Sequence, residues 1–173
     1  MPLSKLQTEI LHLLATHRNP ESYVAGASAL NQNSPRFSGD IDIFHDREEA
    51  VAQTSNEDTV LLAEHGFTFD WLRREPGIHT AVVHRGNEST KLEWVRDSDF
   101  RFFPTVKDEL FGYRLHIADL ATNKALAAAG RRQPQPDNLT GYVEHAGRRR
   151  GYWPSTSEIG SAMLYSDAKK PKP

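Results

Sequence analysis

The sequence lacks cysteine, long apolar runs and any marked excess of charge, and each absence excludes a class of protein. Without cysteine the chain forms neither disulfides nor thiolate metal sites. No apolar run approaches the roughly 20 residues of a membrane-spanning helix, and residues 1–18 lack the apolar stretch of a signal peptide. A formal net charge of −2 argues against a protein that coats nucleic acid without specificity. We therefore expect a soluble, cytoplasmic protein that makes no membrane contact.

The chain of 173 residues is long enough for one domain with a substantial hydrophobic core. We expect that domain to span residues 1–165 and the Lys/Pro-rich residues 166–173 to form a disordered tail. Hydrophobic periodicity and turn residues predict these elements: a helix that begins at residue 3 and stops near residues 19–20, a strand over 23–25, a short helix over 28–31, a strand over 40–44, helical structure over 46–66, strands over 67–74, 80–85, 90–96 and 113–117, and helices over 117–130 and 139–150. This order predicts an α/β (α+β) fold with a mixed sheet flanked by helices.

The helical region over 46–66 carries signals for its start, its middle and its end. Asp46 is suited to cap it, with Glu48 and Glu49 favourable in its first turn. The polar residues 54–58 favour a break, with a second helical piece starting inside them. Gly66 is suited to end the helix.

The chemistry of the sequence is concentrated in the segment over 23–44. A short apolar run leads into a turn of small residues, and Asp40-Ile41-Asp42-Ile43 follows after a polar loop. Because side chains alternate along a strand, the two aspartates point to one face and the two isoleucines to the core. Like charges on one face are tolerated if a cation lies between them, and oxygen ligands suit Mg²⁺ or Mn²⁺. The same motif arises by chance in solvated loops, but the interleaved apolar residues favour a strand.

The segments 26–28 and 36–44 together resemble the signature of the DNA polymerase β-like nucleotidyltransferase superfamily. Within it they are most similar to the AbiEii/AbiGii-type nucleotidyltransferases, many of which are toxins of bacterial toxin–antitoxin systems. The family pattern is Gly-Gly-Ser or Gly-Gly-Thr, a loop, Asp-x-Asp, and a third carboxylate on a later strand. Ala27 replaces the second glycine here. The resemblance implies the polymerase β-like fold and two-metal catalysis, with Asp40 and Asp42 as catalytic metal ligands.

Glu93 is the candidate for the third carboxylate. In the strand over 90–96 it shares a face with Lys91, opposite the apolar side chains. The resemblance implies that Glu93 completes the metal cluster and helps to accept the proton of the attacking hydroxyl. Without the Asp-x-Asp pair, a surface glutamate paired with Lys91 or Arg96 would be the preferred explanation.

Lys124 lies in the middle of an otherwise apolar helix. A lysine whose stem lies on apolar surface while its ammonium stays in water is one explanation. The other is the resemblance to the family's Asp-Leu-x-x-x-Lys helix, matched from Asp119 onward, whose lysine contacts the nucleotide phosphates. Arg131 and Arg132 would add phosphate or RNA contacts, or would only neutralise the helix C-terminus. The residues expected to bind the nucleotide are Gly26, Ala27, Ser28, Arg36, Lys124 and Arg131.

The sequence departs from the family after this helix, where Pro136 and Thr140 stand in place of an arginine and an aspartate. We expect a metal-dependent nucleotidyltransferase that moves an NMP from an NTP to an acceptor hydroxyl. The resemblance implies an RNA acceptor, best a tRNA 3′ end, and a toxin with a cognate antitoxin. Two alternatives stay open: a small-molecule nucleotidyltransferase of the antibiotic-modifying kind, and a nucleotide- or RNA-binding protein whose site has lost its activity.

Overall fold

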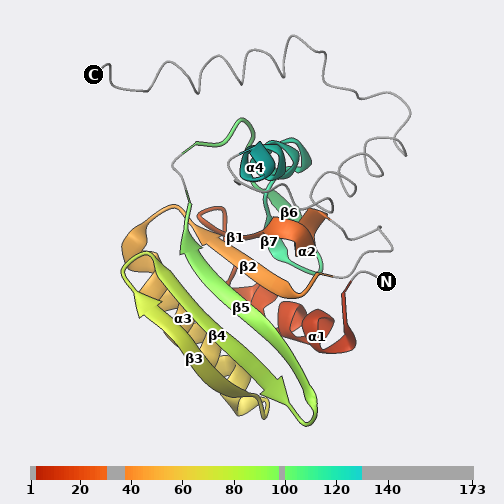
Figure 1. Ribbon diagram of the computed structural model, residues 1–173, viewed down its shortest axis with the longest axis vertical. Helices are drawn as coiled ribbons and strands as arrows, with labels where there is room; N and C mark the ends of the chain where they lie inside the picture. The colour runs from red at the N-terminus through yellow and green to blue at the C-terminus, as the bar shows by residue number, and fades with distance from the viewer. Residues whose placement is uncertain (1–2, 31–37, 98–99, 130–173) are drawn as a thin grey trace.

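One mixed sheet organises the chain (Figure 1). The computed structural model describes residues 3–30, 38–97 and 100–129. Its seven strands lie in the order β3-β4-β5-β2-β1-β7-β6, with β2 parallel to β5 and β1 parallel to β7. The strands are β1 (Ser22–Ala25), β2 (Asp40–His45), β3 (Thr68–Glu75), β4 (Ile78–Arg85), β5 (Glu88–Arg96), β6 (Val106–Asp108) and β7 (Gly112–Arg114). The expected mixed α/β architecture is therefore confirmed.

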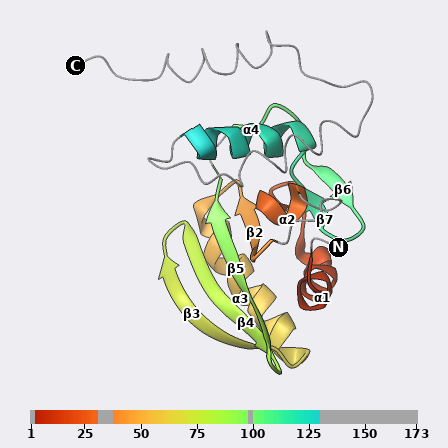
Figure 2. The same ribbon diagram turned by 45° about the vertical axis from the view of Figure 1, so that its right-hand side comes forward.

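The helices lie in two groups around the sheet. They are α1 (Lys5–Leu14), a 3-10 turn η1 (Ala15–His17), α2 (Gly26–Leu30), α3 (Glu48–Glu64) and α4 (Ile117–Ala129). In Figures 1 and 2, α3 lies behind β3 and β4, and α4 lies beside α2 at the other end of the molecule. None of the described helices has both the length and the apolar character needed to cross a membrane.

The core lies between the central strands and the helices α1 and α3. Ile41 and Ile43 of β2 and Leu92 and Trp94 of β5 all have 0% exposure. Burying such side chains stabilises the fold by roughly 1.5–3 kcal/mol each. The predicted alternation along both strands is confirmed, and the intervening side chains lie on the opposite face of the sheet.

The helix α3 is continuous, so the expected break within residues 54–58 is wrong. Ser55 and Asp58 are fully buried instead of solvated. The Ser55 hydroxyl lies 2.7 Å from His79 Nδ1, and the Asp58 carboxylate accepts hydrogen bonds from Arg18 and Trp94. A helix whose buried face carries satisfied polar groups shows no apolar stripe in its sequence.

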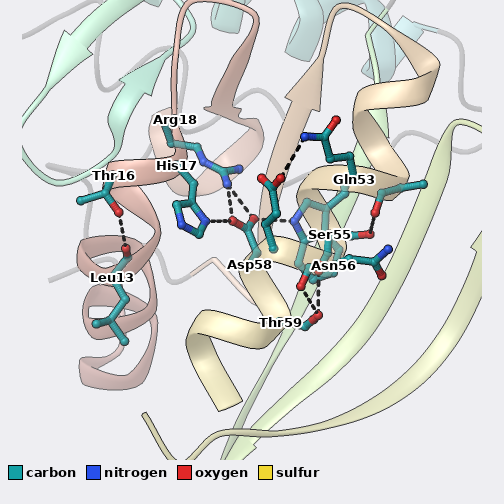
Figure 3. Close-up of polar contacts among 12 residues, drawn as sticks. Leu13, Thr16, His17, Arg18, Gln53, Ser55, Asn56, Asp58 and Thr59 are labelled. Carbon is teal, nitrogen blue, oxygen red and sulfur yellow. Dashed lines mark hydrogen bonds and ion pairs between the residues drawn. The ribbon is translucent and has the colours of Figure 1, made fainter. Parts of the chain in front are cut away.

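Asp58 is the centre of a buried polar network. Arg18 Nη2 donates to both of its carboxylate oxygens at 2.6 Å, and His17 Nδ1 lies 2.8 Å from Oδ1 (Figure 3). Trp94 Nε1 donates to Oδ2 at 2.7 Å. The hydrogen bond to Asp58 raises the pKa of His17. The network joins the segment after α1 to both α3 and β5, and so fixes the buried side of the strand that carries Glu93.

Asp46 does not cap α3, contrary to expectation. The N-cap residue is Arg47, whose side chain makes no capping hydrogen bond. The Asp46 carboxylate instead accepts two hydrogen bonds from Arg101, both of 2.7 Å. Glu48 and Glu49 do lie in the first turn. The chain leaves the helix through Gly66 at a φ of 81°, as its sequence predicts.

One strand was not predicted, and three predictions are not tested by the described residues. The strand β6 was not expected, because three residues are too few to show an alternating pattern. The predicted helix over 139–150 and the predicted tail over 166–173 lie outside the described residues. The single domain over 1–165 stays a prediction.

The Asp58 network predicts a large difference between two arginine substitutions. Arg18→Met leaves a buried carboxylate without its main partner, and we expect it to lower the free energy of unfolding by about 3–5 kcal/mol. Arg47→Met removes a pair with Glu21 whose side chains are 72% and 59% exposed, and we expect a loss under about 1 kcal/mol. Urea unfolding of both variants measures the two losses. Equal losses would contradict the role given to Asp58.

Candidate active site

Parallel pairing of β2 with β5 brings the predicted catalytic carboxylates side by side. Asp42 lies directly opposite Glu93, and Asp40 lies opposite Lys91. Because the intervening Ile41, Ile43, Leu92 and Trp94 enter the core, these four polar side chains share the other face. That face of β3, β4 and β5, turned away from α3, carries no described helix in Figures 1 and 2.

Lys91 lies between two of the carboxylates. Its Nζ is 3.1 Å from Glu93 Oε1 and 3.5 Å from Asp40 Oδ2. The ion pair that the sequence left open for Glu93 is therefore present. Partial burial acts to lower the pKa of Lys91, but the hydrogen bond with Glu93 and the three carboxylate charges raise it. Lys91 thus stays protonated and offsets the repulsion within the group.

Asp42 is the carboxylate of the site whose ionised form is most disfavoured. Burial, followed by the negative charges of Asp40 and Glu93, raises the pKa of Asp42 from 3.8 to about 7. The positive charges of Lys91 and Lys124 act in the opposite direction without cancelling the effect. An added cation beside Asp42 would therefore be strongly favoured.

The turn after β1 presses its backbone against Asp42. Gly26 has a φ of 69°, and a Cβ built on it would lie 1.8 Å from Asp42 Oδ2. Only glycine adopts this conformation at low cost and also leaves room for the carboxylate. The predicted phosphate turn and the predicted metal ligands are thus in direct contact.

Ser28 is oriented differently from the expectation for a phosphate-binding hydroxyl. It is fully buried, and its Oγ donates to the Ala25 carbonyl at 3.2 Å. The hydroxyl stabilises the step from β1 into α2 in this arrangement. A phosphate contact from this turn would come from the backbone amides of Ala27 and Ser28, and that role stays a prediction.

Lys124 lies on α4 within electrostatic reach of Asp42, because its charge acts on the pKa of that carboxyl. The start of the same helix is anchored by Asp119, which accepts hydrogen bonds from the amides of Phe102 and Phe103 at 2.8 and 3.1 Å. Asp119 is therefore a positioning residue for the helix. The other candidates after or before this helix, Arg36, Arg131, Arg132, Pro136 and Thr140, lie outside the described residues.

Gln7 supports the site and was missed by sequence reasoning. Its buried Nε2 donates to the Ser38 carbonyl at 2.9 Å and to Thr90 Oγ1 at 3.1 Å. It thereby ties α1 to the segment before β2 and to β5 itself. The available signal was a polar residue on the apolar side of the first helix, a position that α1 was expected to use only for packing.

The carboxylates fit a hard divalent cation by their chemistry. In the part of the chain that the structure describes, no three Asp, Glu or His side chains are already gathered to hold a metal ion. The available donors are nevertheless all oxygens, which suit Mg²⁺ or Mn²⁺, and burial together with the charges of Asp40 and Glu93 raises the pKa of Asp42. Asp40, Asp42 and Glu93 are the side chains that would hold such an ion.

Comparison with solved structures identifies the fold. A protein of H. pylori described as a candidate nucleotidyltransferase matches 84% of this chain and 67% of its own length, with 16% identity and a TM-score of 0.60. The fold is that of the polymerase β-like nucleotidyltransferases. Weaker matches are a tRNA nucleotidyltransferase complexed with primer tRNA and an ATP analogue, and the RNA terminal uridylyl transferase Cid1. The match to the tRNA nucleotidyltransferase covers 57% of this chain and 26% of that protein, with 18% identity and a TM-score of 0.33. The match to Cid1 covers 86% of this chain and 42% of that protein, with 13% identity and a TM-score of 0.41. No family model and no curated protein matches the sequence.

Within this nucleotidyltransferase fold, the raised pKa of Asp42 predicts a pH-dependent stability. A proton bound at a folded-state pKa of about 7, above the ordinary 3.8, favours the folded state. This contribution is complete below about pH 4 and is lost as the pH rises through about 7. We expect the melting temperature of Asp42→Asn in EDTA to exceed that of the parent by an amount that grows between about pH 4 and pH 7. A difference that does not change with pH would contradict the assignment.

The contact between Gly26 and Asp42 predicts a larger loss of stability for an alanine at Gly26 than for one at Gly39. Gly26→Ala strains a positive φ and pushes the Asp42 carboxylate aside, so we expect a loss of about 2 kcal/mol in the free energy of unfolding. Gly39→Ala is the control, since a Cβ there meets nothing within 4 Å, and its effect should stay within about 0.5 kcal/mol. Chemical denaturation measures both. Similar losses at the two glycines would remove the case for a tight turn.

Proposed function

We propose that this protein is a nucleotidyltransferase that moves a nucleoside monophosphate from an NTP to an acceptor hydroxyl. The observation that carries the proposal is the pairing of Asp42 with Glu93 on one face of the sheet, against the turn at Gly26. In a polymerase β-like fold, this arrangement puts a carboxylate group and a tight backbone turn next to each other. A nucleoside triphosphate bound there would contact both the carboxylate group and the turn.

Asp40, Asp42 and Glu93 would hold two Mg²⁺ or Mn²⁺ ions. Their oxygen donors suit these ions, and the unfavourable negative charge at Asp42 supports the binding of added positive charge. When bound, the ions supply charge that lowers the pKa of the acceptor hydroxyl and neutralises the departing pyrophosphate. The side chains of this chain must provide the rest of the site.

The chain's own groups have separate roles in the proposed reaction. The acceptor oxygen forms a bond to the α-phosphorus as the bond to the pyrophosphate oxygen breaks. Glu93 is assigned to receive the proton of the acceptor hydroxyl. The backbone of the turn at Gly26 and the ammonium of Lys124 are assigned to the phosphates, since both lie near Asp42. Arg36 and Arg131 are proposed as further phosphate contacts from their sequence positions.

We infer that the acceptor is RNA, with a tRNA 3′ end favoured, and that the protein is a toxin with a cognate antitoxin. Support comes from the resemblance of segments 26–28 and 36–44 to the AbiEii/AbiGii-type nucleotidyltransferases. The neighbouring face of β3, β4 and β5 carries no described helix, which would leave room for a large acceptor.

Transfer of label from an NTP tests the function directly. The protein is incubated with each α-labelled NTP, Mg²⁺ and total RNA, and we expect one NTP to label RNA. Asp42→Asn should reduce the labelling about a hundredfold or more, because it removes a ligand of the ions that would neutralise charge at the reacting phosphate. Asp70→Asn is the matched control: this β3 carboxylate has 76% exposure and pairs with His84, and its variant should retain activity.

The other outcomes separate the alternatives. Label that appears on small molecules but not on RNA would contradict the RNA acceptor and support a small-molecule enzyme. NTP binding without transfer to any acceptor would contradict an active nucleotidyltransferase and support a binding protein. Equal losses in Asp42→Asn and Asp70→Asn would overturn the site itself.

A further inference from the structure

We propose that Lys91 is an internal cation that holds the carboxylates of β2 and β5 together before a divalent ion binds, and that it withdraws when the ion arrives. The inference rests on the proposed function, because it concerns the same metal-binding group. It adds a residue that competes with the ion. The basis is the position of Nζ, 3.1 Å from Glu93 Oε1 and 3.5 Å from Asp40 Oδ2.

The strand geometry explains why Lys91 reaches both partners. Its Cα is paired with that of Asp40 on the neighbouring strand, so its stem starts beside that carboxylate. Glu93 is two residues further along the same strand and therefore on the same face. A single ammonium can thus bridge the two strands at the point where their negative charges meet.

Lys91 also has the means to leave. Its side chain is 38% exposed, and its flexible four-carbon stem lets the ammonium turn into water without disturbing the backbone. By contrast, the buried Arg18 is fixed to Asp58 by two hydrogen bonds. The pairs of Lys91 are partly solvated, so a divalent ion can replace them.

Two other cations act on the group from separate elements. The charge of Lys124 on α4 acts on Asp42. The pKa of Arg73 on β3 is raised first by its hydrogen bond to Glu75 and, most weakly, by the charge of Glu93. Lys91, in turn, contacts two of the carboxylates directly.

Removal of the Lys91 charge has two consequences that differ in sign. Without a metal, the carboxylates repel one another without their bridging ammonium, so the fold becomes less stable. With a metal, the ion no longer has to break two ion pairs, so it binds more tightly. A lysine with a merely structural role would give only the first effect.

The experiment compares Lys91→Met with Lys107→Met, an exposed strand lysine on β6. Mn²⁺ binding is titrated by electron paramagnetic resonance, and melting temperatures are measured in EDTA and at saturating Mn²⁺. For Lys91→Met we expect a Mn²⁺ dissociation constant about three- to tenfold lower than that of the parent. We also expect a lower melting temperature in EDTA and a larger rise on Mn²⁺ addition. Lys107→Met should match the parent in every measurement.

The result separates this inference from the proposed function. Mn²⁺ binding by the parent, with equal or weaker binding by Lys91→Met, would overturn the role of Lys91 alone. A parent that binds no Mn²⁺ would overturn the proposed function and this inference with it. If Lys91→Met does not fold in EDTA, Lys91→Met/Glu93→Gln decides: recovery of the fold supports the inference, and continued unfolding contradicts it.

Discussion

Repulsion among three carboxylates on two adjacent strands is the constraint around which this structure is built. The parallel register of β2 and β5 places Asp42 opposite Glu93, and the alternation of the strand adds Asp40 to the same face. The cost is visible in the pKa of Asp42, raised to about 7 by burial and by these neighbours. A fold selected only for stability would have no need of such a group, and the ammonium of Lys91 offsets only part of the repulsion.

The opposite face of the same strands supplies what keeps this arrangement in place. Fully buried apolar side chains enter the core beside each charged position, so a slip of one residue would bury the carboxylates and expose the core. Trp94, the neighbour of Glu93, is further tied to Asp58 on α3. Gly26 completes the support from the side, because its backbone closes on Asp42 where any other residue would collide.

Much of the fold was predictable because it depends on short-range patterns. Alternation along β2 and β5 identified the strands and their buried faces, and turn residues identified most boundaries. The expectation that Glu93 joins Asp40 and Asp42 came from the family resemblance. The failures have physical causes. The buried face of α3 carries polar groups whose hydrogen bonds are satisfied, so the sequence of its middle resembles a solvated segment. Asp46 binds Arg101, which is far away in the sequence, instead of capping the helix. The bridging position of Lys91 depends on which strands are neighbours in the sheet, which no local pattern contains.

A crystal structure of the protein soaked in Mn²⁺ and a non-hydrolysable NTP analogue, with anomalous scattering recorded for manganese, tests the central claim most directly. The account predicts anomalous peaks between Asp40, Asp42 and Glu93, the triphosphate beside the turn at Gly26, and the Lys91 ammonium turned away from both carboxylates. Saturating Mn²⁺ that leaves no peak at these three carboxylates, with Lys91 still bridging Asp40 and Glu93, would contradict it.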